Sequence, residues 1–192
     1  MLFKWALIEK IVQSEKIQTR RPVKDGECLR QIESPHGGYT PVGVVQNGRM
    51  KIALNKDYAV QYGRGKPTVQ YQKYRGESRM VRDVMSYDFY KNVVDKHGVT
   101  AQVFLSHYGY KPLRIVITDI RREDVRDISY ADAECEGFET RSEFWKTWCA
   151  FYDKPGVAVI EAHTPHDVIV QAGLKERPDE LYQAWAYVFE VV

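Results

Sequence analysis

The chain has 192 residues, of which 44% are hydrophobic, 12% aromatic and 28% charged. This composition excludes an intrinsically disordered chain, and the length suits one globular domain, with or without an insertion. The formal net charge of +2 excludes a uniformly basic nucleic-acid coat but allows local basic patches.

Cysteine and histidine usage indicates the compartment and the need for cofactors. The three cysteines, Cys28, Cys135 and Cys149, have no Cys-x-x-Cys spacing, so we expect reduced thiols and a cytoplasmic protein. His163-x-x-His166 has no third ligand nearby, and we expect neither a metal ion nor another cofactor. No apolar stretch is long enough to cross a bilayer or has the pattern of a signal peptide, so we expect no membrane association.

The first candidate site follows an amphipathic segment. Apolar residues at spacings of one, three and four predict a short helix over 3–13. Pro22 prevents residues 14–22 from continuing it, so we expect Lys16 and Thr19 at a helix exit or a strand start. Side chains can converge on a ligand there. The alternative is that this Lys-x-x-Thr-Arg-Arg run is only a solvated basic loop.

Turn residues divide the next segment of the chain. Lys-Asp-Gly within 23–28 and Pro-His-Gly-Gly within 33–38 predict loops. Asn47-Gly48 lies between the apolar runs 42–45 and 50–54. This pattern is a strong short-range signal for a β-hairpin.

Two short strands, 58–61 and 68–74, are predicted around a glycine-rich loop. Within this loop, Arg64 and Lys66 stand beside glycines that permit close approach of a ligand, so both are candidate phosphate contacts. The spacing differs from that of a P-loop, and an ordinary turn explains the loop equally well.

Residues 75–112 differ in character from their surroundings and are a candidate insertion. A charged segment over 75–82 precedes a predicted helix over 86–97 and a predicted strand over 102–105.

A β-branched, alternating run predicts a core strand over 113–120. The mixed charges of residues 121–126 indicate a solvated face with local ion pairs, and phosphate contacts by its arginines are the alternative.

Two helices are expected next. Ser129 is a predicted N-cap for a short helix over 131–136, which the following glycine ends. Thr140-x-x-Glu143 matches a capping box that opens a second, aromatic-rich helix. Glu136 stands at the end of the first helix and is a candidate for an inward-pointing carboxylate.

The last part of the chain predicts a strand over 157–160, a polar loop over 161–167 and a short helix over 168–174. A final strand over 184–192, with aromatic residues on one face, would close a sheet.

Two of these motifs together resemble the ASCH domain family of the PUA-like superfamily. They are the run from Lys16 to Arg21 behind a short helix, and residues 128–138 leading into the aromatic helix. Ser14 stands where the family commonly has glycine. The resemblance implies an α+β fold, a PUA-like (ASCH) β-barrel with flanking helices. It also implies a single domain over 1–192 with residues 75–112 as an inserted middle region.

The resemblance further implies a catalytic site. Small ASCH enzymes that hydrolyse N4-acetylcytidine have a Lys, a Thr three residues later and a Glu from a helix, and Lys16, Thr19 and Glu136 match this pattern. The Lys amine would activate the Thr hydroxyl, and the Glu carboxyl would pass a proton to the leaving amine.

Three functions are expected on these grounds. The first is binding of RNA or a nucleotide in a basic cleft beside Glu136, lined by Lys16, Arg20, Arg21, Arg64 and Lys66. The alternative is a metal-independent amidohydrolase acting on an acylated, modified nucleoside such as N4-acetylcytidine. The third is a phage-type interaction module in which residues 75–112 recognise a protein partner.

Overall fold

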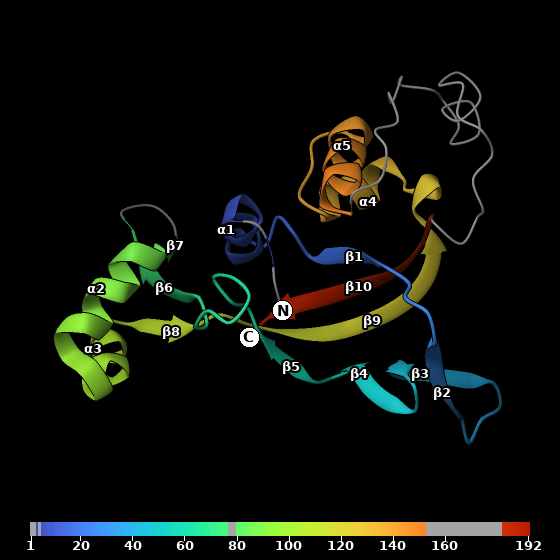
Figure 1. Cartoon of the computed structure of the whole chain (residues 1–192), viewed down its shortest axis with the longest axis horizontal. Helices are drawn as coiled ribbons and strands as arrows, with labels where there is room; N and C mark the ends of the chain where they lie inside the picture. Colours follow the sequence, from blue (N-terminus) through green and yellow to red (C-terminus); the bar gives the residue numbers. More distant parts are fainter. Residues whose placement is uncertain (1–2, 4, 77–79, 153–181) are drawn as a thin grey trace. The chain divides into compact units, whose positions relative to one another are not determined.

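The computed structural model describes residues 3, 5–76, 80–152 and 182–192 (Figure 1). The chain forms two compact units. Unit 1 comprises Met1–Glu15, Lys56–Val116 and Glu190–Val192, and unit 2 comprises Lys16–Asn55 and Ile117–Phe189. No helix in the described ranges is long and apolar enough to cross a membrane. The expectation of one domain with an insertion over 75–112 stays a prediction, as do the elements expected over 157–174, which lie outside the described residues.

The described part of unit 1 contains three helices, a 3-10 turn, the three strands of a small sheet and strand β5 (Asp57–Ala59), which pairs with β9 (Arg114–Asp124). Its elements are α1 (Trp5–Gln13), β5 (Asp57–Ala59), β6 (Gln70–Arg75), β7 (Met80–Val84), α2 (Tyr87–His97), η1 (Gly98–Thr100), α3 (Ala101–His107) and β8 (Tyr110–Pro112). The helix predicted over 3–13 is confirmed as α1, whose Ile8, Ile11 and Val12 are fully buried. Strand β6 is central in the order β7-β6-β8, with both neighbours antiparallel.

The segment 86–107 forms a helical pair over one cluster of apolar side chains. The helix predicted over 86–97 is confirmed, and Ser86 caps it by accepting from the Phe89 backbone N–H. The strand predicted over 102–105 is wrong, because this segment lies in α3. Leu105 lies one helical turn beyond Ala101, and both are buried in the cluster with Met85 and Val93. A short apolar run fits strand and helix alike, and this packing favours the helix.

The described part of unit 2 contains two sheets and two helices. Its elements are β1 (Gln18–Pro22), β2 (Glu27–Glu33), β3 (Tyr39–Gln46), β4 (Arg49–Ala53), most of β9 (Arg114–Asp124), η2 (Val125–Asp127), α4 (Tyr130–Cys135), α5 (Arg141–Phe151) and most of β10 (Gln183–Val191). Strand β10 lies between β1 and β9, and β2, β3 and β4 form a separate sheet. The final strand expected over 184–192 is therefore confirmed.

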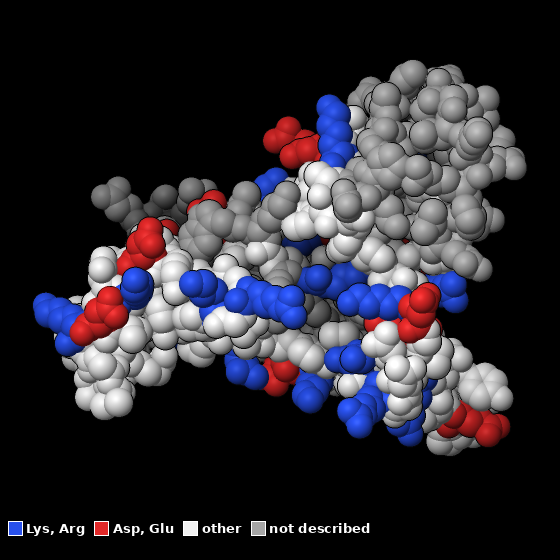
Figure 2. Space-filling model, viewed as in Figure 1, with Lys and Arg blue, Asp and Glu red and all other residues white. Residues whose placement is uncertain are grey.

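The β2–β4 sheet both confirms and corrects the sequence interpretation. The hairpin around Asn47-Gly48 is confirmed, and both turn residues have positive φ. The loops predicted over 23–28 and 33–38 are wrong where they overlap β2, which pairs with β3 from Glu27 to Glu33. Because β2 is largely exposed, it shows no alternation of apolar residues. Basic side chains gather over β3 and β4 on the face shown in Figure 2.

The α+β class is confirmed, with mostly antiparallel strands and a sheet that curls like half a barrel (Figure 1). Strand β9 is longer than predicted and extends through residues 121–124. The local ion pairs expected over 121–126 are present, because Arg121 pairs with Glu123 and Arg126 with Asp124. The short helix after Ser129 and the helix after Thr140 are confirmed as α4 and α5, with both N-cap hydrogen bonds present. These helices place the carboxyl end of α4 near β1.

Candidate functional site

Polar side chains from the start of β1 are turned into unit 2 rather than into solvent. Lys16 is 1% exposed, and Gln18 and Arg20 are each 3% exposed. Since side chains alternate along an extended segment, these three residues share one face, and all three contact α4 or Glu136 directly after it. The Ile17 N–H also donates to the Cys135 carbonyl oxygen, which joins the start of β1 to the last turn of α4.

The Lys16 ammonium lies against the C-terminal end of α4. Its Nζ donates three hydrogen bonds of 2.7 Å, to the Gln18 carbonyl, the Glu136 carbonyl and Glu136 Oε2. These acceptors use all three N–H groups of an ammonium. Burial lowers the pKa of Lys16, and this effect outweighs the opposing charge of Glu136.

Glu136 also contacts a second buried cation. Its Oε1 accepts from Arg20 Nη1 at 3.2 Å, while Arg20 Nη2 lies 3.0 Å from Glu123 Oε2 and 3.4 Å from Asp132 Oδ1. The Arg20 side chain has 0% exposure, and its Nε has no hydrogen-bond partner in the described part of the chain. The Glu136 carboxylate therefore bridges Lys16 and Arg20, and the carboxylates of Glu123 and Asp132 also pair with Arg20.

The accessible edge of this cluster consists of residues from β9 and α4, and the buried Gln18 of β1 lies behind it. Gln18 Nε2 donates to the backbone carbonyl and Oδ1 of Asp132, both at 2.9 Å. Arg121, whose side chain is 42% exposed, lies within 3.3 Å of carboxylates of Asp119, Glu123 and Asp132. We call the whole set the Lys16–Glu136 network; its members are Lys16, Gln18, Arg20, Asp119, Arg121, Glu123, Asp132 and Glu136.

Asp132 is held in its charged form by its hydrogen-bond partners and by Arg20. Burial alone would raise the pKa of Asp132, but hydrogen bonds from Gln18 and Ser129 and the charge of Arg20 outweigh it and lower the pKa to about 2. Carboxylates outnumber cations in the network, so its net charge is not positive. Such a site suits a polar ligand without a large negative charge.

The structure brings together some of the predicted site residues. The expected meeting of Lys16 and Glu136 is confirmed by their 2.7 Å contact, and Arg20 joins them. Thr19 lies between Gln18 and Arg20 in β1 and so points to the opposite face, opposite Tyr187 of β10. Among the described residues, no hydrogen bond involves the Thr19 hydroxyl and this network.

The remaining predicted residues lie elsewhere. Arg21 is half-buried in β1, one residue beyond Arg20 and opposite Trp185. Arg64 and Lys66 are exposed in unit 1, where Lys66 Nζ donates to Tyr87 Oη at 3.2 Å and lies 4.6 Å from the centre of its ring. A basic cleft shared by these residues and Lys16 stays a prediction.

Sequence reasoning missed the acidic half of the network. Asp119, Arg121 and Glu123 occupy every second position of β9, which extends to Asp124. This period of two would have predicted that the three side chains share one face of a strand. Asp132 was visible in Ser129-x-x-Asp132, in which the Ser129 hydroxyl accepts from the Asp132 N–H. Over the described ranges, no group of three or more His, Cys, Asp or Glu side chains is arranged to hold a metal ion.

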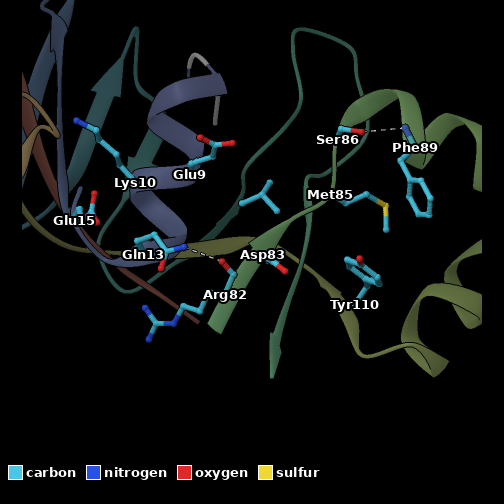
Figure 3. A pocket seen from close by; sticks show the side chains of 11 residues that line it. Glu9, Lys10, Gln13, Glu15, Arg82, Asp83, Met85, Ser86, Phe89 and Tyr110 are labelled. Carbon is cyan, nitrogen blue, oxygen red and sulfur yellow. Dashed lines mark hydrogen bonds between the residues drawn. The ribbon is translucent and has the colours of Figure 1, made fainter. Parts of the chain in front are cut away.

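Unit 1 has a pocket of about 830 Å³ along β7 (Figure 3). Glu9, Lys10 and Gln13 of α1 line it opposite Arg82 and Asp83 of β7. The Gln13 side-chain amide donates to the Arg82 carbonyl at 2.8 Å, which ties the helix to the strand. Side chains of both charges line the walls, so the pocket does not favour a ligand of either sign.

Comparisons with known proteins do not identify the chain: no protein-family model matches it, and neither a curated protein nor a solved structure does.

Proposed function

We propose that the chain is an ASCH-like domain of PUA type that binds a modified nucleoside at the Lys16–Glu136 network. The observation that carries this proposal is the buried contact between Lys16 and Glu136, two residues that match the family pattern. Ser14 supports it as well, because its φ of 65° is the left-handed conformation that favours the glycine common in that family. The curled, mostly antiparallel sheet agrees with a PUA-type fold.

Charge balance favours a nucleoside over a phosphate-rich ligand. Lys16 and Arg20 are buried and paired with carboxylates, and a phosphate would have to displace those carboxylates to reach them. A nucleobase instead presents neutral donors and acceptors, which Arg121 and Asp132 can match at the network edge. Of the residues expected to bind RNA phosphates, Arg21, Arg64 and Lys66 are the better candidates.

A second candidate function, hydrolysis of an acyl amide on that nucleoside, is favoured by the lowered pKa of Lys16 beside Glu136. Transfer of the ammonium proton to Glu136 leaves a neutral amine and a carboxylic acid. Lys16 then takes a proton from water as its oxygen bonds to the acyl carbon, and Glu136 protonates the amine nitrogen as the C–N bond breaks. These two transfers leave Lys16 as an ammonium and Glu136 as a carboxylate, which is the starting pair. Thr19 has no role in this scheme because it lies on the other face of β1.

Substrate access requires movement at the network edge. The side chains of Lys16 and Glu136 are 1% and 4% exposed, whereas Arg121 and Asp132 are 42% and 28% exposed. In this proposal, the nucleoside displaces the Arg121–Asp132 contact when it binds.

Binding is tested by titrating the full chain with a panel of acylated and unmodified nucleosides, including N4-acetylcytidine. Arg121→Gln should weaken binding about tenfold, because a charged hydrogen bond is lost. The matched control is Arg122→Gln, next to it on the exposed side of β9, which should bind as the unmodified chain does. Absence of binding to every nucleoside, or equal losses in both variants, would exclude the proposed site.

Turnover is tested separately by mass spectrometry of the same mixtures. Loss of the acyl group should occur with the unmodified chain and not with Glu136→Gln, provided that circular dichroism shows the variant folded. Binding without any acyl loss would leave the nucleoside-binding function and eliminate the hydrolase.

A further inference from the structure

The small sheet of unit 1 separates its side chains into two chemically different faces. Residues directly opposite each other in antiparallel strands share a face. Tyr71, Lys73 and Arg75 alternate along β6 and so lie on one face. The residues opposite them lie on the same face: Lys111 of β8, and Arg82 and Met80 of β7. We call this set the basic face of the β6–β8 sheet.

The opposite face is already occupied by helices. Tyr110 of β8 lies on that face and packs against the α2–α3 cluster that includes Met85 and Leu105 (Figure 1). Asp83, the one carboxylate in strands β6, β7 and β8, also lies there, opposite Gln72, and accepts from Tyr74 Oη at 2.8 Å. The three strands therefore place no negative charge on the basic face.

Lys73, Arg75 and Lys111 of the basic face make no ion pair in the described part of unit 1. Lys73 lies directly opposite Arg82, and like charges in that position destabilise a sheet. Arg82 donates to the Val12 carbonyl and to Ser14 Oγ, and neither acceptor is charged. Lys111 lies 5.1 Å from the centre of the Tyr71 ring. Lys73, Arg75 and Lys111 are all exposed.

We propose that this basic face binds the sugar–phosphate backbone of single-stranded nucleic acid. Alternate residues of one strand are about 7 Å apart and neighbouring strands about 5 Å apart, so Lys73, Arg75 and Lys111 form a compact row of positive charge. Exposed Lys and Arg side chains supply most backbone contacts in nucleic-acid complexes, and a linear polyanion gains by releasing counterions. This binding does not depend on the nucleoside site proposed for unit 2.

A nucleic acid fits the face better than a lipid surface does. Met80 is the one strongly exposed apolar side chain that the register places on it, and peripheral membrane binding needs a larger apolar area beside the basic residues. An anionic membrane is therefore an alternative that the experiment has to separate from RNA.

The test compares the full chain with Lys73→Gln/Arg75→Gln/Lys111→Gln, using a fluorescent 20-nucleotide oligouridylate as the probe over a range of salt concentrations. Each phosphate contact on a single strand contributes about 0.7 to the salt slope. The triple variant should thus lower the slope of log K against log salt by about 2, and it should weaken binding at least tenfold at low salt. The matched control, Lys56→Gln/Lys91→Gln/Lys96→Gln, removes the same charge from exposed positions of unit 1 and should keep most of the slope.

Three results would overturn the proposal: an unchanged slope in the triple variant, an equal fall in the control, or binding to phosphatidylserine vesicles with none to the oligonucleotide. If the triple variant does not fold, Arg75→Gln alone should reduce the slope by about 0.7, and an unchanged slope in that folded variant would also overturn it. Nucleoside binding by the triple variant should be unchanged, so failure of this inference is distinguishable from failure of the unit 2 site.

Discussion

Lys16 Nζ and Glu136 Oε2 lie 2.7 Å apart although 120 residues separate them in the chain. Both side chains are almost completely buried, so their charges are removed from water and depend on each other and on Arg20. This contact, with the two backbone hydrogen bonds that Lys16 donates, joins the start of β1 to the C-terminal end of α4. The same two residues therefore bear on both stability and the proposed chemistry.

The stability costs of removing Lys16 and of removing Glu136 should not be additive. Lys16→Met leaves Glu136 without one of its cations, and Glu136→Gln leaves Lys16 buried without its carboxylate. Each should cost about 3 kcal/mol of unfolding free energy, because an unpaired buried charge is expensive. The double variant should cost clearly less than the sum of the single costs. Urea denaturation of the four proteins gives the coupling energy directly.

The control for this cycle is the exposed pair Arg114–Asp57, whose side chains are 42% and 48% exposed at a separation of 2.5 Å. Water and salt screen such a pair, so its coupling energy should be small and should fall further as salt is added. A coupling for Lys16 and Glu136 no larger than that of the control pair would contradict our account of the network.

Asp132 should make stability depend on pH in acid. Its pKa of about 2 in the fold is below the value of about 3.9 expected in the unfolded chain. The unfolded chain then binds the proton first, so the contribution of Asp132 is complete above pH 4 and is lost as pH falls toward 2. Asp132→Asn should be less stable at pH 7, by about 1 kcal/mol after allowance for its partial exposure. This difference should shrink steadily between pH 4 and pH 2.

Thermal unfolding followed by circular dichroism across that pH range provides the measurement. Asp127→Asn is the control, because Asp127 is exposed and lies outside the network; its difference from the unmodified chain should be small at every pH. A constant gap between Asp132→Asn and the unmodified chain from pH 7 to pH 2 would show that the Asp132 charge is not stabilising.

Local signals predicted the elements whose conformation is decided by nearby residues. The Asn47-Gly48 hairpin and the caps at Ser129 and Thr140 depend on contacts within four residues along the chain, which a sequence displays directly. The strand predicted over 102–105 was wrong because the helical conformation of α3 depends on packing against Met85 and Val93, which lie outside that segment. Loops were predicted where β2 lies because this strand is largely exposed and shows no alternation of apolar residues.

The candidate site was predictable in part for a similar reason. The position of Lys16 after a helix and that of Glu136 at a helix end marked them as candidates, and the family resemblance paired them. The same resemblance included Thr19, whereas the alternation of an extended strand separates Thr19 from the face that Gln18 and Arg20 share. Prediction of the acidic partners on β9 required the end of that strand to be known. Mixed charges after a core strand do not show where the strand ends.

Gly43 should be intolerant of even one added carbon. A Cβ at this position would lie 2.2 Å from the Ile52 carbonyl oxygen in β4 and 2.6 Å from Met50 Sδ. Met50 can move, but the Ile52 oxygen belongs to the backbone of the paired strand. Gly43→Ala should therefore cost at least about 2 kcal/mol and disturb the β3–β4 pairing.

Gly38→Ala is the matched control for Gly43→Ala. Gly38 has a φ of 81° but no atom near a Cβ, so the backbone strain alone should cost about 1 kcal/mol. Denaturation midpoints of the two variants are compared, and a Gly43→Ala loss no greater than that of Gly38→Ala would argue against close approach of the two strands.

The α2–α3 cluster should respond to truncation of Leu105 and not of its neighbour Val103. Leu105 is 1% exposed among Met85, Val93 and Ala101, whereas Val103 is 71% exposed on the same helix. Leu105→Ala removes buried methyl groups and leaves a cavity, which should cost about 2–4 kcal/mol. Val103→Ala removes similar apolar volume from solvent and replaces a β-branched residue with a better helix former, so stability should change by less than about 0.5 kcal/mol. In the Leu105→Ala variant, the backbone amides of α2 and α3 should lose protection from hydrogen exchange. Equal protection in the two variants would mean that α3 does not pack as described.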